Sequence, residues 1–273
     1  MGSKPVGPPP EVLAAFGLSD GTLAKVEGGQ GYTFCIGHTI LKPVACKEEA
    51  IWCARTFNQI RQDGFRVPQP LPAQDGRWVV QGWAAWERLT GIHDVRNQWH
   101  QMLDACDAFH AALADTPKPS FIAEQTHCWA LADRFVWGEE ELSLPDQVKT
   151  VVSRVQHLLC PVENVPCQVI HGDLGGNILY EPGLPPGIID FSPYWRPTGY
   201  AKAIAVIDAV AWNRADVALL RCMDKVDMGY SFLSRAVVFR LAAIATHPNN
   251  SSQILDELRA YRPVIQYILC RAE

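Results

Sequence analysis

The sequence has no long apolar run and no long basic run. Its 273 residues are 48% hydrophobic and 19% charged, and the formal net charge is −5. No apolar stretch approaches the roughly 20 residues that a membrane-spanning helix needs, and the basic face typical of nucleic-acid-binding domains is missing. The polar, proline-rich residues 1–5 contain no signal-peptide core. We therefore expect a cytoplasmic protein with neither a membrane nor a nucleic acid as partner.

Cysteine is present but never as a Cys-x-x-Cys pair. The nine cysteines are scattered between positions 35 and 270, and neither their odd number nor their spacing indicates a zinc site or a disulfide framework. We expect them to be small apolar groups in a reducing compartment. The Gly-x-Gly-x-x-Gly pattern that opens a helix in dinucleotide-binding folds is also missing, so such a fold is not supported.

The most informative segment is 169–180, which reads Val-Ile-His-Gly-Asp-Leu-Gly-Gly-Asn-Ile-Leu-Tyr and is followed by Ile-Ile-Asp-Phe at 188–191. Its apolar ends predict two short strands, at Ile178 to Tyr180 and Gly187 to Ile189. The residues between them, 181–186, are rich in proline and glycine, which is typical of a turn. The segment is therefore predicted to fold as a β-hairpin.

Three polar side chains of this hairpin suit phosphoryl transfer. Cross-strand neighbours lie about 4.5–5.5 Å apart, so folding returns Asp190 to the side of Asn177, where both can bind one Mg²⁺. This ion prefers oxygen ligands and takes one or two carboxylates together with phosphates. Asp173, at the mouth of the loop, is the candidate catalytic residue that orients or deprotonates an acceptor hydroxyl. The alternative is a hairpin with an Asp turn and an Asn cap and no ligand.

The combination of His171-Gly172-Asp173, a downstream Asn177 and Ile-Asp-Phe resembles the signature of the aminoglycoside/choline phosphotransferase superfamily, small-molecule relatives of protein kinases. Residues 191–197, Phe-Ser-Pro-Tyr-Trp-Arg-Pro, resemble a subgroup whose members mostly lack an assigned substrate. The resemblance implies a two-lobed α+β fold of the protein-kinase type, with ATP or GTP and Mg²⁺ as cofactors. Three residues separate Asp173 from Asn177, one fewer than usual, and two of them are glycines that permit a tighter turn.

The chain is divided accordingly into three parts. Residues 1–10 are expected to be a disordered leader, 11–88 a β-rich nucleotide-binding lobe that includes the hinge, and 89–273 a mostly helical lobe for catalysis and substrate binding. The apolar periodicity predicts helices over 47–60, 93–113, 122–137, 145–159, 200–223, 230–246 and 251–269.

A glycine-rich loop in the small lobe permits close approach of the backbone to phosphates. It consists of Gly28, Gly29, Gln30 and Gly31. A hairpin turn without a ligand is the alternative. Lys42 follows at the end of an apolar strand, and the resemblance implies that it holds the α- and β-phosphates. A solvated lysine at a strand end is the other interpretation.

The resemblance also implies a glutamate partner for this lysine on the next helix, for which Glu49 is preferred over Glu48. Helix-start glutamates placed favourably by the helix dipole are the alternative. The strand from Arg77 is expected to end at the hinge between the lobes, whose backbone offers hydrogen bonds to adenine. The hinge candidates are Gln81, Gly82 and Trp83.

The candidate substrate-binding residues follow the metal ligand Asp190. Tyr194 and Trp195 offer aromatic faces, and Arg196 could grip an anionic acceptor or the γ-phosphate. Alternatively, Trp195 packs in the core while Arg196 caps a helix or pairs with Asp208. This aspartate lies in an apolar helix and is expected to accept hydrogen bonds from the loop above it, because an unpaired buried carboxylate is costly.

Two histidines in apolar surroundings are expected to be structural. His110 is predicted to be a hydrogen-bonded core residue, and His171 to brace the catalytic loop. Neither is therefore assigned to the chemistry.

The sequence thus predicts an ATP-dependent phosphotransferase that transfers the γ-phosphate to a hydroxyl of a small metabolite. Amino alcohols, sugars and nucleosides remain open as acceptors, and the oligomeric state is not predicted. The alternative is a pseudokinase or regulatory module that binds nucleotide without transferring phosphate. A protein kinase is disfavoured, because His-Gly-Asp replaces His-Arg-Asp and an Ala-Pro-Glu segment is missing.

Overall fold

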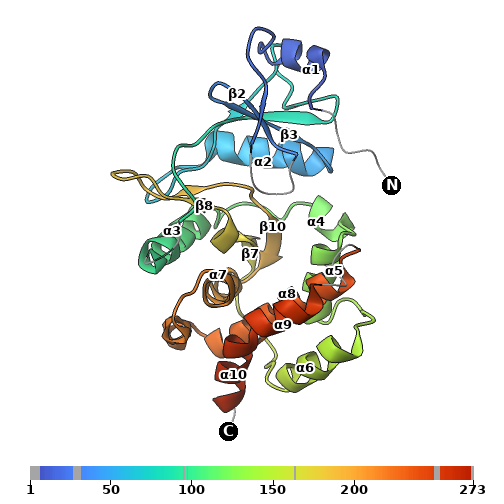
Figure 1. Ribbon diagram of the computed structural model, residues 1–273, viewed down its shortest axis with the longest axis vertical. Coiled ribbons are helices and arrows are strands. Elements are labelled where there is room, and N and C mark those ends of the chain that lie inside the picture. Colours follow the sequence, from blue (N-terminus) through green and yellow to red (C-terminus); the bar gives the residue numbers. More distant parts are fainter. Residues whose placement is uncertain are drawn as a thin grey trace.

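The computed structural model describes residues 7–26, 32–94, 96, 98–162, 164–248 and 253–271. Figure 1 shows a small lobe of β-sheet and one long helix above a larger helical lobe, with β7, β8 and β10 where the two meet. The small lobe contains α1 (Pro10–Ala15), β1 (Ala24–Lys25), β2 (Phe34–Ile36), β3 (Thr39–Pro43), α2 (Lys47–Gln59), β4 (Pro70–Leu71), β5 (Val79–Val80) and β6 (Trp83–Glu87). Of the expected leader, residues 1–6 lie outside the described residues, whereas Pro8 is buried and Pro10 begins α1.

The small-lobe sheet is antiparallel, in the order β1-β2-β3-β6-β4, and β5 pairs with β6. Alternation along β3 buries Leu41 in a core shared with Val12 and Trp83. The next residue, Lys42, pairs with Ala84 of β6 and points away from that core, toward the large lobe. The sheet therefore delivers one lysine to the junction of the lobes.

The large lobe is built on two buried helices, α7 and α8. It contains α3 (Trp99–Ala112), α4 (Phe121–Glu124), α5 (Cys128–Val136), α6 (Asp146–Gln156), β7 (Gln168–His171), the 3₁₀ turn η1 (Leu174–Gly176), β8 (Ile178–Leu179), β9 (Gly187–Ile188), β10 (Pro193–Arg196), α7 (Thr198–Trp212), the 3₁₀ segment η2 (Val217–Lys225), α8 (Gly229–Thr246), α9 (Ile254–Ala260) and α10 (Arg262–Cys270). Helix α8 is buried along most of its length, as expected of a helix surrounded by others, and α5, α6 and α7 pack around it.

Three predicted helices are each interrupted in the structure. Pro263 in the first turn of α10 separates this helix from α9. The expected helix over 200–223 is divided into α7 and η2. Arg214 follows α7 with φ of 59°, which is not helical, and the Asp216 side chain accepts a hydrogen bond from the Ala218 N–H at the start of η2. The expected helix over 122–137 is divided into α4 and α5, and His127 caps the second of these. Within the described part of the chain, no helix is long and apolar enough to cross a bilayer.

Candidate active site

The loop after β7 is held by two buried histidines. The Asp173 N–H donates to Nδ1 of His171 at 3.1 Å, so the proton of this imidazole lies on Nε2, which is 3.3 Å from the Ile189 carbonyl oxygen. The main-chain N–H of His171 donates to Nε2 of His110 at 3.0 Å. His171 thus braces the loop as expected, and His110, expected only as a hydrogen-bonded core residue, supports the same loop through the His171 N–H.

Burial makes these two histidines sensitive to acid. It lowers the pKa of His110 to about 3 and that of His171 to about 4. Below about pH 6.5 the unfolded chain takes up these protons and the folded chain does not, so acidification favours unfolding. We expect the free energy of unfolding to fall between pH 6.5 and 4, by about 1.4 kcal/mol per pH unit for each histidine.

Urea unfolding at a series of pH values tests this expectation. His110→Gln keeps a hydrogen-bond acceptor for the His171 N–H but removes one titrating group, so the slope should decrease by about 1.4 kcal/mol per pH unit. Met102→Ala, a buried change on the same helix, should lower stability without altering the slope. If the free energy of unfolding of His110→Gln depended on pH as steeply as that of the wild type, His110 would not be one of the groups that cause the loss of stability in acid.

The predicted hairpin is present and places Asn177 beside Asp173. Ile178 pairs with Ile188, and the Asn177 carbonyl accepts from the Ile189 N–H at 2.9 Å, so Asp190 follows directly. The side-chain nitrogen of Asn177 donates to the Asp173 carbonyl at 2.8 Å and to Oδ2 of Asp173 at 3.0 Å. The amide oxygen therefore faces away from Asp173.

The short catalytic loop reaches this geometry through the 3₁₀ turn η1. The Asn177 N–H donates to the Leu174 carbonyl at 2.9 Å, which closes the turn. Gly175 packs on α7, where an added Cβ would lie 3.4 Å from the Ala205 carbonyl oxygen. Three residues are therefore enough to bring Asn177 back to Asp173.

Lys42 makes an ion pair with Asp190 and not with Glu49. Its ammonium contacts Oδ1 of Asp190, whereas the Glu49 carboxylate accepts from the Gln125 side chain at 2.8 Å. Burial lowers the pKa of Lys42 to about 8, and the adjacent carboxylate favours the charged form. The expected Lys42–Glu49 pair is thus wrong for this structure, because the lysine reaches the large lobe while the glutamate bonds to the segment after α4.

The residues at this junction fit a divalent cation that arrives with a nucleotide. Among the described residues, no group of three or more His, Cys, Asp or Glu side chains could hold a metal ion. Asp190 would supply one carboxylate and Asn177 one amide oxygen, and Mg²⁺ typically takes few protein ligands and completes its shell with phosphate and water.

Arg196 is not available to a substrate. Its guanidinium donates to Oδ2 of Asp133 at 3.0 and 2.7 Å and to Glu139 at 2.7 and 2.9 Å, and it lies over the Trp137 ring. The prediction that it grips an anionic acceptor is wrong, because β10 turns it toward α5. Trp195 packs against the large-lobe core, and Tyr194 is buried.

The hinge was predicted one strand too early in the chain, before β6 and not after it. Gln81 and Gly82 form the tight turn between β5 and β6, with φ of 46° and 77°, and Trp83 begins β6. The lobes are joined at the other end of β6, by residues 88–91. Gly91 passes so close to the Tyr180 carbonyl that a Cβ would lie 2.9 Å from its oxygen. Gly28, Gly29, Gln30 and Gly31 lie outside the described residues.

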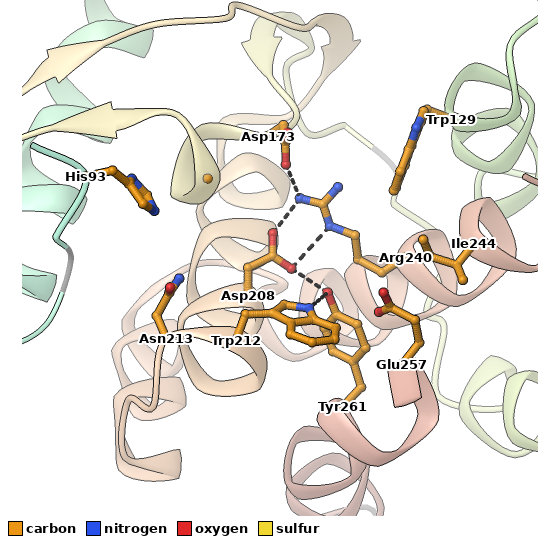
Figure 2. A pocket seen from close by; sticks show the side chains of 11 residues that line it. His93, Trp129, Asp173, Asp208, Trp212, Asn213, Arg240, Ile244, Glu257 and Tyr261 are labelled. Atoms are coloured by element: carbon orange, nitrogen blue, oxygen red, sulfur yellow. Dashed lines mark hydrogen bonds and ion pairs between the residues drawn. The ribbon is translucent and has the colours of Figure 1, made fainter. Parts of the chain in front are cut away.

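Two cavities open beside Asp173, and Arg240 and Trp129 line both of them. The first has a volume of about 320 Å³ and the second of about 290 Å³. The second is walled by small-lobe helix α2 through Glu49 and by buried Tyr194 of β10. The first is shown in Figure 2 and is lined by His93, Trp129, Asp173, Gly176, Asp208, Trp212, Asn213, Arg240, Ile244, Glu257 and Tyr261.

Sequence reasoning missed the buried arginine in this cavity. Arg240 lies on α8, and its Nη2 donates to Oδ1 of Asp173 at 2.6 Å and contacts Oδ2 of Asp208. The expectation that Asp208 bonds to the loop above it is corrected, because its partners are Arg240 and the Tyr261 hydroxyl. A charged residue within an apolar helix was the available signal.

A small antiparallel sheet above a helical lobe, with an Asp-containing loop between them, defines the kinase-like two-lobed fold. The structure of a microcompartment-associated aminopropanol kinase shares it, with a TM-score of 0.66 and 16% identity over 95% of both chains. A thermostable mutant of the aminoglycoside phosphotransferase APH(4)-Ia, in complex with ADP and hygromycin B, has a TM-score of 0.60 and 14% identity, over 95% of this chain and 97% of its own.

A choline/ethanolamine kinase family protein from Mesorhizobium loti is also similar. It has a TM-score of 0.54 and 14% identity, over 92% of this chain and 87% of its own. These similarities confirm the predicted two-lobed α+β fold. No protein-family model matches the sequence, and no curated protein matches it.

Proposed function

We propose that the protein is a small-molecule kinase that transfers the γ-phosphate of ATP to a hydroxyl group. The observation that carries this proposal is the convergence of Lys42 from the small lobe with Asp190, Asn177 and Asp173 from one loop of the large lobe. Phosphoryl transfer needs these groups because catalysis consists mainly of positioning and charge neutralisation. The solved neighbours include kinases of small molecules.

Each residue has a distinct role in this proposal. Asp190 and Asn177 would hold Mg²⁺, which would supply positive charge at the phosphates. The Lys42 ammonium leaves Asp190 to bind the phosphates. The Asp173 carboxylate orients the acceptor hydroxyl and accepts its proton.

The nucleotide base is assigned to the connection between the lobes. The backbone of residues 88–91 takes the role first given to residues 81–83, since it follows β6 into the large lobe. The glycines at 28–31 remain the predicted cover of the phosphates. The use of ATP rather than GTP remains a prediction, and so does a cytoplasmic location.

The first cavity beside Asp173, the one shown in Figure 2, favours a small acceptor of low charge. Asp173, Asp208 and Glu257 face one guanidinium, that of Arg240, and burial raises the pKa of Glu257 to about 7. The cavity is thus weakly negative at neutral pH, which suits an uncharged metabolite or a single amine better than a polycation. Trp129 adds an aromatic wall.

The test is an ADP-release assay with Mg·ATP across aminopropanol, ethanolamine, choline, hygromycin B and pooled hydroxylated metabolites, with mass spectrometry of the products. We expect a phosphomonoester of a small alcohol, and none with the Asp190→Ala protein. Asp224→Ala, a change at an exposed aspartate that pairs with Arg271, is the matched control. Nucleotide binding without transfer to any acceptor or to water would instead support the pseudokinase alternative.

A further inference from the structure

Arg240 links the catalytic loop to the base of the large lobe. Its side chain is 8% exposed, and Figure 2 shows the Asp173 and Asp208 carboxylates both pointing at its guanidinium. Nη2 donates to Oδ1 of Asp173 at 2.6 Å and also contacts Oδ2 of Asp208, while Nε donates to Oδ1 of Asp208 at 3.2 Å. One guanidinium is thus shared by two carboxylates.

The guanidinium is itself firmly anchored. Oδ1 of Asp208 accepts from the Tyr261 hydroxyl at 2.7 Å, and this hydroxyl accepts from Nε1 of Trp212 at 3.2 Å. The guanidinium carbon lies 5.4 Å from the centroid of the Trp129 ring. Groups from α5, α7 and the junction of α9 and α10 therefore fix Arg240 before any ligand binds.

Asp173 is held at both of its carboxylate oxygens. Oδ1 accepts from Arg240, and Oδ2 accepts from the Asn177 side chain at 3.0 Å. An ionised carboxylate offers about four acceptor positions, so these bonds leave room for an acceptor hydroxyl. The Asp173 side chain remains 44% exposed and lines both cavities.

We propose that Arg240 is a positioning residue for phosphoryl transfer, which fixes the Asp173 carboxylate in the orientation that receives the acceptor hydroxyl. The inference rests on the proposed kinase function. An arginine is required because its planar fork donates to two carboxylates at once, whereas a lysine ammonium is a compact point charge on a flexible stem. Asp208 and Tyr261 act through Arg240 and hold it in place.

Arg240→Lys tests the proposal, since it keeps the charge and loses the fork. Steady-state kinetics are measured with Mg·ATP and aminopropanol, and with water as acceptor. We expect kcat to fall about 10–100-fold, as for a misplaced catalytic group, while KM for Mg·ATP and its calorimetric Kd change less than about threefold. A wild-type kcat in Arg240→Lys overturns the proposal.

Arg235→Lys is the matched control for damage to the helix. Arg235 is also buried on α8, but it donates to the carbonyls of Val136 and Cys160 and not to the site. A purely structural role of Arg240 would give both variants the same loss of kcat and of Tm. Equal losses therefore overturn the proposal, and a selective loss of kcat in Arg240→Lys supports it.

A double variant tests the proposal independently, in case Arg240→Lys does not fold. Arg240→Met combined with Asp208→Asn removes both buried charges together, so no unpaired charge is left in the core. We expect this protein to bind Mg·ATP as the wild type does and to show a kcat at least as low as that of Arg240→Lys. A wild-type kcat would overturn the proposal. If the wild type transfers phosphate neither to any acceptor nor to water, the proposed function itself is wrong. The wild-type assay therefore distinguishes failure of the proposed function from failure of the role proposed for Arg240.

Discussion

Replacing Asp173 by asparagine is expected to lower kcat about 10²–10⁴-fold, the usual contribution of a positioned acid or base. The side chain keeps its size but loses its charge and one acceptor oxygen. Arg240 and Asn177 both donate to this carboxylate, so an amide can satisfy only one of them. The variant thus loses both the group that accepts the hydroxyl proton and its fixed orientation.

The measurement is the rate of ADP formation at saturating Mg·ATP, together with the Kd of Mg·ATP. The Kd should stay within about threefold of the wild type, because Asp173 faces the acceptor and not the metal. Asp107→Asn is the control, since this exposed carboxylate pairs with Lys202 on the large lobe. A kcat close to that of the wild type would remove Asp173 from the mechanism.

The catalytic hairpin could be predicted because its signals are local. Apolar residues at 178–179 and 187–188, with a proline- and glycine-rich turn between them, specify both strands and their pairing. That pairing alone brings Asp190 back to Asn177. The sequence also singled out Lys42 of β3, since a charged residue that ends an apolar strand needs a partner, but it gave Glu49 as that partner where the structure has Asp190.

The parts of the site that were not predicted depend on the packing of distant elements. Asp173 and Arg240 are 67 residues apart in the chain, and Glu49 and Gln125 are 76 apart. Helical periodicity shows which face of a helix is apolar, but not which buried polar groups of two helices meet. The hinge was misplaced for a local reason, because Gln81 and Gly82 read as part of a strand although they form its turn.

Replacing Asp190 by alanine is expected to abolish the stabilisation that ATP gives in the presence of Mg²⁺. At a ligand concentration 100-fold above Kd, binding adds about 2.7 kcal/mol to the free energy of unfolding, which corresponds to roughly 5–10 °C in Tm for a chain of this size. Asp190 provides the carboxylate of the proposed metal site, so without it Mg²⁺ has one neutral protein ligand, Asn177. The gain in Tm should then be no larger with Mg·ATP than with ATP and EDTA.

Two variants separate the metal ligand from the backbone at this position. Asp190 has φ of 49°, a left-handed conformation that costs most residues about 1–2 kcal/mol and that asparagine tolerates better than alanine. Asp190→Ala should therefore start from a lower Tm than Asp190→Asn. Asp190→Ala should lose the Mg²⁺-dependent gain, whereas Asp190→Asn, which keeps a neutral ligand oxygen, should show a smaller gain than the wild type. Asp94→Asn, an aspartate paired with Arg96 at its own loop, should retain the full gain. A full Mg²⁺-dependent gain in Asp190→Ala would show that the metal is bound elsewhere, because alanine has no side-chain oxygen to bind it.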